Sequence, residues 1–305
     1  MRKDYCFPLL VGPYLSYFHT LHRIFNSLLG RTLEHLYIMM RPMDTYDKIA
    51  IAQIVLYSIF LAGAIYLALV HGFGRNVGWL YLVLFSLIRI VGSAFRVATL
   101  NSAAIWLFIG WNTLNSIGVS PLILILLGLL SRVLVNIRKS RPTQLNPHHL
   151  RLTQALVVVG LVLGIVGGVK TGLASVAAKA TVEYKAESKV GLGLLVGGYA
   201  LLCATTVIIG AQVKSADPAE WRIIPTVAAS LAFVLVRLVY SCIRVYGDSG
   251  SDGSVGEYFG MSVLMELFVV LICEAVGFSL RKLRHGRFAR SGARDHVDAL
   301  PESKA

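Results

Sequence analysis

The chain has 305 residues, of which 56% are hydrophobic and 15% charged, and its mean hydropathy is +0.68. A composition this apolar excludes an ordinary soluble globular protein and predicts an integral membrane protein. The net charge of +13 must then lie mostly outside the membrane core, in loops and tails.

The first predicted region is an N-terminal extension, residues 1–48. Pro8 and Pro13 interrupt its apolar stretch and no small-x-small cleavage site follows, which argues against a secretory signal peptide. Met43 begins a short polar lead into an apolar run, and we expect the native chain to start there. The alternative is an amphipathic surface segment around 14–29.

Seven apolar runs are long enough to cross a hydrocarbon core about 30 Å thick, which takes about 20 helical residues. They are continuous rather than alternating, which argues against a β-barrel. The predicted fold class is all-α, a polytopic bundle of seven transmembrane helices in one domain, residues 49–280. We expect the spans at 49–70, 77–100, 117–135, 152–174, 190–213, 223–243 and 258–280.

The second span carries a polar stripe. Ser86, Arg89, Ser93 and Arg96 are spaced by three, four and three residues, which puts them on one face of a helix. A charge near the bilayer centre is costly, so we expect Arg89 to face the bundle interior and to find a partner there. Arg96 lies nearer the outer end of the span and is expected either to do the same or to extend to the headgroup region.

The third span follows an apolar stretch too long for one crossing. Residues 103–135 would form a helix of roughly 50 Å. Polar residues around Asn112–Ser116, together with Ser120 and Pro121, predict an interruption. We expect 103–116 to be an interfacial or re-entrant lead-in with two tryptophans at headgroup level, and a single tilted, kinked helix is the alternative.

The fourth span has glycines on one face at intervals of four. They predict a small-residue seam that lets a neighbouring helix approach closely, and the fifth span offers two matching glycines. A dimer contact between two copies is the other use of such a seam. The seam residues are Gly160, Gly164, Gly168 and Gly172, with Gly193 and Gly197 opposite.

The sixth and seventh spans supply further intramembrane charges. Arg237 and Tyr240 share a face of the sixth span with Arg244, and the seventh span carries Glu266 and Glu274. At 1.5 Å per residue, Arg89, Arg237 and Glu266 all lie within about 6 Å of the membrane midplane on its outer side. We therefore predict that Glu266 pairs with Arg89 and that Arg237 shares the carboxylate or faces a ligand at the same depth.

Two interpretations of this group remain open. It is either a salt-bridged clasp that ties three helices together, or a ligand site in which surplus positive charge binds a phosphate or carboxylate. Glu274 lies about 7 Å to the inner side with no basic residue at its depth. It is predicted to exchange a proton or, alternatively, to hydrogen-bond a neighbouring side chain.

The ends and loops carry Lys and Arg unequally. Fourteen lie on one set of faces, which includes the tail at 281–305, and eight on the other. The positive-inside rule predicts that the N-terminus lies outside or in a lumen and that the basic tail is cytosolic and largely disordered. The basic loop and tail are expected to contact anionic lipid headgroups of the plasma membrane or an endomembrane, rather than nucleic acid.

No motif for catalysis is found. Histidines are absent from the spans, the seventh span has no lysine, and no Gly-x-Ser-x-Gly or phosphate-binding loop occurs. The four cysteines suggest neither a disulfide framework nor a metal site. We therefore expect no enzyme activity, no cofactor and no metal.

The runs LFSLIRIVGSAF, IGVSPLILILLGLLSRV and VRLVYS, with a glutamate in the last span, resemble an uncharacterised fungal family of seven-pass membrane proteins. The likeness runs from about Met43 to Leu280 and implies the fold but no activity. More distantly, Arg237-x-x-Tyr240 followed by Glu257 and Tyr258 is similar to fungal Rta-like lipid-translocating exporters. Ser241 stands where that pattern has a second arginine, so lipid export is an analogy.

Together these patterns predict a membrane protein that binds or transports an anionic amphiphile or lipid at the intramembrane Arg/Glu site. A seven-span receptor that docks a partner on the basic loop 134–151 is one alternative. A structural membrane protein without a ligand is the other.

Overall fold

The computed structural model describes residues 43–71, 77–102, 104–140, 147–178, 184–212, 223–247 and 254–279. Residues 1–42 of the predicted extension 1–48 and the tail at 281–305 lie outside these residues. Apart from the last residues of α3, the helices described below belong to one compact unit of the chain, which begins at Asp44.

The described residues form helices and no strands, as predicted. Seven helices are long and apolar enough to cross a membrane, at Thr45–Val70, Gly78–Asn101, Ile105–Val135, His148–Ala174, Ala186–Ala211, Ile223–Tyr246 and Val255–Ser279. The number of spans is confirmed. The helices are α2 (Thr45–His71), α3 (Val77–Asn101), α4 (Ile105–Ser116), α5 (Val119–Ser140), α6 (Pro147–Ala178), α7 (Ala186–Gln212), α8 (Ile223–Tyr246) and α9 (Val255–Glu257).

The last helix is irregular at its beginning. α9 runs directly into a π-helical segment, η2 (Tyr258–Leu264), and the chain then continues as α-helix over 265–279. We refer to α9, η2 and 265–279 together as the last helix. A π-helical turn is rare and frequently marks a functional site, and this one ends two residues before Glu266.

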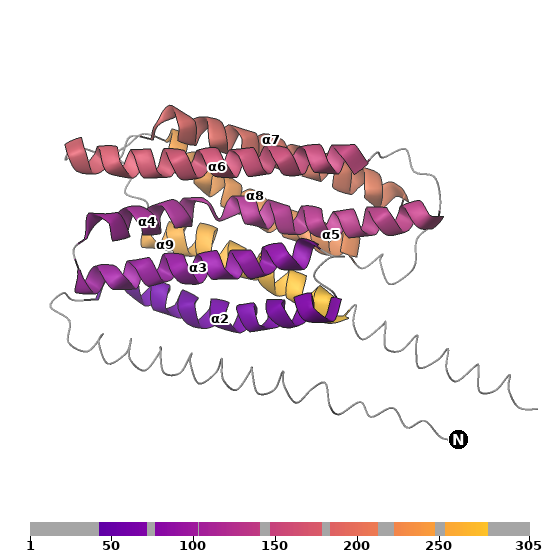
Figure 1. The fold of residues 1–305 in the computed structure, drawn as a ribbon, viewed down its shortest axis with the longest axis horizontal. Helices are drawn as coiled ribbons and strands as arrows, with labels where there is room; N and C mark the ends of the chain where they lie inside the picture. The colour runs from indigo at the N-terminus through magenta and orange to yellow at the C-terminus, as the bar shows by residue number, and fades with distance from the viewer. Residues whose placement is uncertain are drawn as a thin grey trace, which may run out of the picture. The chain divides into compact units, whose positions relative to one another are not determined.

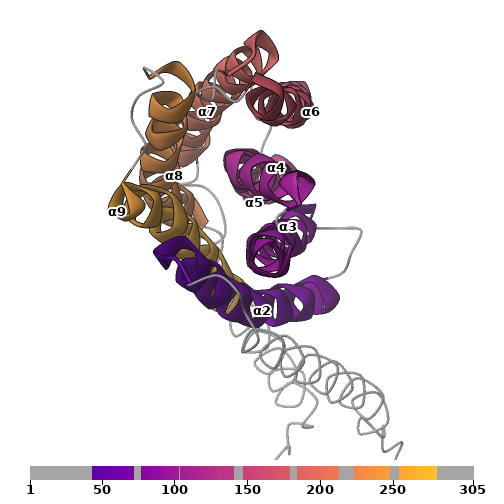
Figure 2. The same cartoon turned by 90° about the vertical axis from the view of Figure 1, so that its left-hand side faces the viewer.

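Seen along the helix axes, α2, the last helix, α8, α7 and α6 follow one another in an arc, and α3 with α4 and α5 lies on its open side (Figures 1 and 2). α5 packs against α6, α7 and α8. In the span that contains α5, 83% of the apolar 18-residue stretch is buried inside the protein. In the other six spans the buried share of the corresponding stretch is 22–50%. α5 is therefore the core helix, and the other spans have apolar faces left to contact lipid.

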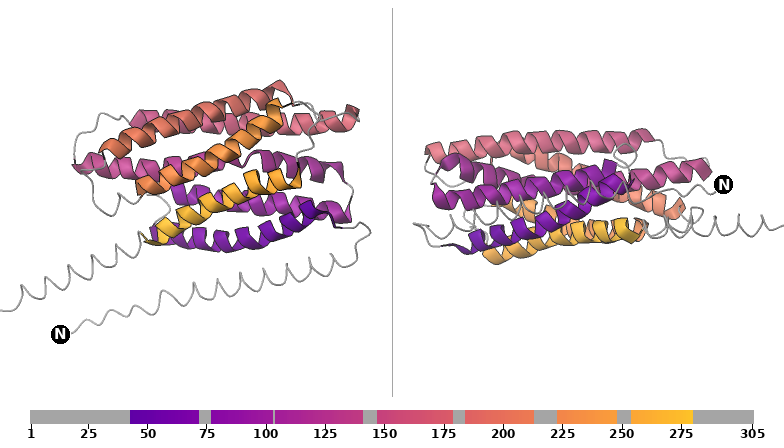
Figure 3. Two further views of the ribbon diagram at one scale, coloured as in Figure 1. Left: turned by 180° about the vertical axis from the view of Figure 1, so that it is seen from behind. Right: turned by 60° about the horizontal axis from the view of Figure 1, so that its bottom comes forward.

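The third span is one broken helix. α4 ends at Ser116, α5 begins at Val119, and the two run in the same direction on either side of a turn (Figures 1 and 3). Pro121 explains the break, because it has no N–H to donate to the carbonyl of Ile117 and its ring crowds that carbonyl. Ser120 donates to this carbonyl instead, from its backbone N–H at 3.1 Å and its hydroxyl at 3.2 Å. The interfacial or re-entrant lead-in predicted for 103–116 is not observed, and the alternative of one kinked span is the better description.

The glycine seam joins α6 to α7, as predicted, but through different residues of α7. A β-carbon on Gly191 would lie 2.9 Å from the backbone nitrogen of Gly164 and 3.0 Å from the oxygen of Gly160. Gly193 and Gly197 are not close-packed in the seam: a β-carbon on Gly193 would meet only the hydroxyl of Tyr246, at 3.9 Å, and one on Gly197 would meet Leu156 of α6 only at 3.8 Å, an ordinary contact distance. The prediction matched the glycines by their interval along the sequence. It could not include the rotation of α7 about its own axis, which directs a different face of α7 toward α6.

The other glycines of the seam, Gly168 and Gly172, contact α4 rather than α7. A β-carbon on Gly168 would lie 3.2 Å from Thr113, and one on Gly172 would lie 2.9 Å from Ile109. Both partners are on α4. One glycine face of α6 thus admits two neighbours, and the half of α6 near its C-terminus packs closely against the broken span.

Candidate functional site

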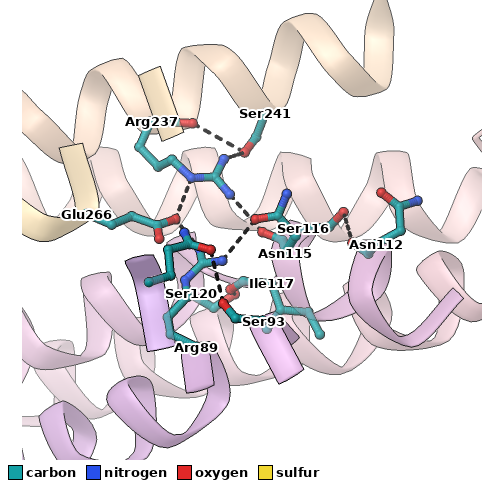
Figure 4. A network of polar contacts seen from close by, with 11 residues as sticks. Arg89, Ser93, Asn112, Asn115, Ser116, Ile117, Ser120, Arg237, Ser241 and Glu266 are labelled. Atoms are coloured by element: carbon teal, nitrogen blue, oxygen red, sulfur yellow. Dashed lines mark hydrogen bonds and ion pairs between the residues drawn. The ribbon is translucent and has the colours of Figure 1, made fainter. Parts of the chain in front are cut away.

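The two central arginines and Glu266 form a buried ion cluster, which we call the clasp: Arg89 on α3, Arg237 on α8 and Glu266 on the last helix (Figure 4). A terminal nitrogen of Arg89 donates to Oε1 of Glu266, and Nε of Arg237 donates to the same oxygen at 2.7 Å. The three residues are 4%, 2% and 0% exposed. The pairing predicted from depth is present, and Arg237 does share the carboxylate.

The break in the third span completes the clasp. The last carbonyls of a helix have no partner within it, and Asn115 lies in the last turn of α4. Its backbone carbonyl accepts from Nη2 of Arg237 at 2.8 Å, and its side-chain oxygen accepts from Nη1 of Arg89 at 2.9 Å. Ser241 accepts from Nη1 of Arg237 at 2.6 Å. Four helical segments therefore meet at two guanidinium groups.

Gly118 in the turn leaves the room that the clasp occupies. A β-carbon there would overlap a terminal nitrogen of Arg89 and lie 2.6 Å from Oε1 of Glu266. Because both side chains are fixed by their mutual ion pair, neither can yield cheaply. A side chain at this position would therefore disturb the charge cluster unless the turn shifts.

The other predicted stripe residues are buried too. Ser86 is 0% exposed and donates to the carbonyl of Leu82 in its own helix. Ser93 donates to the side-chain oxygen of Gln53 on α2 at 3.0 Å. The stripe faces the bundle interior as expected.

The structure decides between the two alternatives predicted for Arg96, a partner in the bundle interior or extension to the headgroup region. It does not extend to the headgroup region, because its side chain is only 8% exposed and its Nε donates to Asp47 on α2 at 2.8 Å. Asp44 adds a second carboxylate at 3.6 Å. The guanidinium also lies over the rings of Trp111, at 4.6 Å, and Tyr46, at 5.5 Å. The predicted first span began at residue 49, which left Asp47 outside the membrane and hid this partner.

Glu274 is placed away from the arginines, as its depth predicted. It is 7% exposed and lies against α2, where a β-carbon on Gly63 would be 2.8 Å from its Oε2. Within the described residues it makes no ion pair and no hydrogen bond, so the alternative of a hydrogen-bonded neighbour is not observed.

A pocket opens beside the clasp, bounded by the α4–α5 break, α6, α7 and α8. The centres of water-sized molecules can occupy about 70 Å³ of it. Its wall is partly apolar and partly polar, with Arg237 at the buried end and the exposed Arg244 on the next turns of α8. None of the lining residues is an Asp or Glu. They are Asn112, Asn115, Ser116, Ile117, Ser120, Gly160, Leu161, Gly164, Gly168, Tyr184, Ser188, Leu192, Leu195, Arg237, Tyr240, Ser241, Arg244 and Val245.

The sequence of these seven spans also matches a known family. A family model, a domain of unknown function named DUF7702, matches residues 43–283. The chain belongs to this family. The match covers all seven spans and every residue of the clasp and the pocket, and it agrees with the extent of the seven-pass likeness found in the sequence. No curated protein matches the sequence.

Sequence reasoning missed Asp47, Asn115 and Gly118. The signals for the last two were present, since both belong to the polar, glycine-containing stretch before Pro121 that predicted an interruption. The sequence did not show how deep in the membrane that stretch lies. As part of the span rather than a lead-in to it, the break lies level with Arg89 and Glu266.

No metal site is seen in the described part of the chain, where no three His, Cys, Asp or Glu side chains lie close enough to hold an ion. The three described cysteines, Cys203, Cys242 and Cys273, are free thiols. The pocket beside the clasp presents guanidinium, hydroxyl and amide groups, which are able to donate hydrogen bonds to an anion.

Proposed function

We propose that this integral membrane protein binds the anionic group of an amphiphile in the pocket beside the clasp, and moves that amphiphile across the membrane. The observation that carries the proposal is the lining of the pocket. It contains two arginines, one of them fully buried, and no carboxylate.

The net positive charge of the site supports the proposal that its ligand is an anion. In the clasp two guanidinium groups share one carboxylate, so one positive charge is left over, and Arg244 adds another. Arg244 makes no ion pair within the described residues. The surplus charge of the buried clasp is costly unless an anion accompanies it, and the exposed Arg244 adds positive charge at the mouth of the same pocket.

The apolar part of the wall supports an amphiphile rather than a simple ion. Leu161, Leu192, Leu195 and Val245 line the same pocket as the arginines. A ligand with an anionic head and a hydrocarbon chain would satisfy both parts of this surface.

The broken helix supports movement of the ligand. Transporters commonly bind their substrates near the membrane midplane, where interrupted helices expose backbone groups to the site. Asn115 supplies such a group here, since its carbonyl contacts the guanidinium of Arg237.

We propose the orientation given by the positive-inside rule, in which the Arg244 end of α8 faces the outside or a lumen and the C-terminus lies in the cytosol. A reporter fused to the C-terminus, scored for accessibility in intact and in permeabilised cells, tests it. Access in intact cells would reverse the topology.

Binding is tested with single-chain amphiphiles that share one tail and carry an anionic, zwitterionic or cationic head. A ligand that binds only the folded protein at about 100 times its Kd stabilises it by about 2.7 kcal/mol, which thermal unfolding in detergent detects. We expect anionic heads to stabilise the wild type. Arg244→Gln should weaken that effect, and Lys189→Gln, at an exposed lysine near the same end of the bundle but outside the pocket, should keep it in full.

Equal stabilisation by all heads would overturn the anion site. No stabilisation by any head would leave a structural clasp without a ligand. Transport is tested separately, by movement of a bound amphiphile between the leaflets of reconstituted vesicles. Binding without movement would favour a receptor or sensor over a transporter.

A further inference from the structure

We propose that the head group taken by the pocket is a phosphate monoester in its dianionic form. This inference rests on the proposed function and names the ligand class for the same site.

The first argument is the balance of charge. Arg89, Arg237 and Arg244 bring three positive charges, and Glu266 brings one negative charge, so the site as a whole carries a net charge of two. A carboxylate or a phosphate diester would neutralise half of this charge. A phosphate monoester carries close to two negative charges at neutral pH and would neutralise all of it.

The second argument is the supply of hydrogen-bond donors. Ser188 is 7% exposed, lines the pocket, and its hydroxyl has no partner in the described residues. The hydroxyl of Tyr240 and the guanidinium of Arg244 also make no hydrogen bond there. Donors left without partners in the pocket wall favour a ligand rich in acceptors, and the three terminal oxygens of a phosphate monoester are strong acceptors.

The third argument is the position of Arg237. Its Nε is occupied by Glu266, and its terminal nitrogens donate to Ser241 and to the carbonyl of Asn115 (Figure 4). All three of Arg237, Ser241 and Asn115 line the pocket. A guanidinium has five N–H groups in a fixed fork, so the terminal nitrogens held in this way keep donors for a phosphate oxygen.

The volume of the pocket limits what enters with the phosphate. About 70 Å³ for the centres of water molecules holds a few waters or one small polar head, because a single water needs about 10–15 Å³ by this measure. The head is therefore small, and the hydrocarbon chain must continue along the leucines toward the neighbouring helices.

The ionisation of the ligand gives a specific test. The second pKa of a phosphate monoester is about 6, whereas a phosphate diester stays a monoanion throughout the physiological range. The titratable and charged groups that face the pocket are Arg237, Tyr240 and Arg244 from α8 and Tyr184 from the segment before α7, with Arg89 and Glu266 behind Arg237. Among the residues that line the pocket, those of α4, α5 and α6 include no titratable side chain.

The experiment measures Kd on the full-length protein in detergent, by native mass spectrometry or thermophoresis, at about pH 5 and about pH 7.5. Four probes are compared: a phosphate-monoester lipid, a phosphate-diester lipid with the same chains, a carboxylate amphiphile, and inorganic phosphate. We expect the monoester lipid to bind about tenfold more tightly than the diester at the higher pH, the effect of one added charge-assisted hydrogen bond. At the lower pH the difference should fall to about twofold or less.

Arg244→Gln is the diagnostic variant, because it removes one charge without touching the clasp. It should abolish the preference for the monoester and its dependence on pH, while the diester still binds. Lys189→Gln is the matched control and should keep both. Tyr240→Phe should reduce monoester binding less than Arg244→Gln does, since it removes a neutral donor.

Equal binding of monoester and diester at the higher pH, or a preference that does not change with pH, would overturn the phosphate-monoester assignment and leave the proposed function standing. Failure of every anionic amphiphile to bind would overturn both. Binding of inorganic phosphate as tight as that of the monoester lipid would support the phosphate chemistry and overturn the amphiphile.

Discussion

Arg89 and Arg96 lie seven residues apart on the same face of α3, and both are buried, but their surroundings differ. Arg89 shares one carboxylate with Arg237 and is packed around a helix break. Arg96 has two carboxylates, Asp47 and Asp44, and two aromatic rings. Asp44 is 47% exposed at its side chain, so that end of the arrangement reaches the surface of the protein.

The comparison shows how the same residue type is used in two ways. Around Arg96 the negative charges outnumber the positive one, and the aromatic faces stabilise the cation further. Around Arg89 and Arg237 the positive charges are in excess. The first arrangement is complete by itself and ties α2 to α3, whereas the second is left with charge that a ligand can neutralise.

The largest expected effect follows from Glu266→Gln, which leaves two buried guanidinium groups without their carboxylate. Removing one partner of a buried pair costs about 3–5 kcal/mol, so the free energy of unfolding in detergent should fall by about that amount. Arg89→Ala combined with Glu266→Ala should recover part of the loss. If the double variant is as unstable as the sum of the single ones, the two residues are not coupled.

A smaller effect is expected from Asp47→Asn. Arg96 loses its closest carboxylate but keeps Asp44 and both rings, so the loss is about 1.5–3 kcal/mol, that of a hydrogen bond to a charged group. Glu187→Gln in the exposed pair with Lys170 serves as a control and should leave the unfolding curve unchanged. A loss as large as that of Glu266→Gln would mean that the two arginines are held equally strongly.

The smallest of the three effects is expected from Gly118→Ala, about 1–3 kcal/mol, because the added methyl group overlaps the clasp but the turn can shift. Gly164→Ala is the matched control, since a β-carbon there would meet no atom within 4 Å. Unfolding measured under the same conditions should separate the two. Equal stability of both variants would show that the clasp tolerates a side chain at the break.

The apolar length of the spans and the relative depth of the three clasp residues could be read from the sequence. Seven runs gave seven spans, because only a helix satisfies its own backbone across about 30 Å of hydrocarbon. Depth along those spans then brought Arg89, Arg237 and Glu266 to one level, where burial of charge in a membrane favours their pairing with one another.

The tertiary structure decided which side chains meet across helices. The rotation of α7 selected Gly191 rather than Gly193 for the contact with α6, and the inclusion of the break within the third span brought Gly118 and Asn115 to the clasp. The pocket, too, exists only where α4–α5, α6, α7 and α8 converge. Periodicity fixes positions along a single helix, but the rotation and spacing of neighbouring helices result from the packing of all their side chains together.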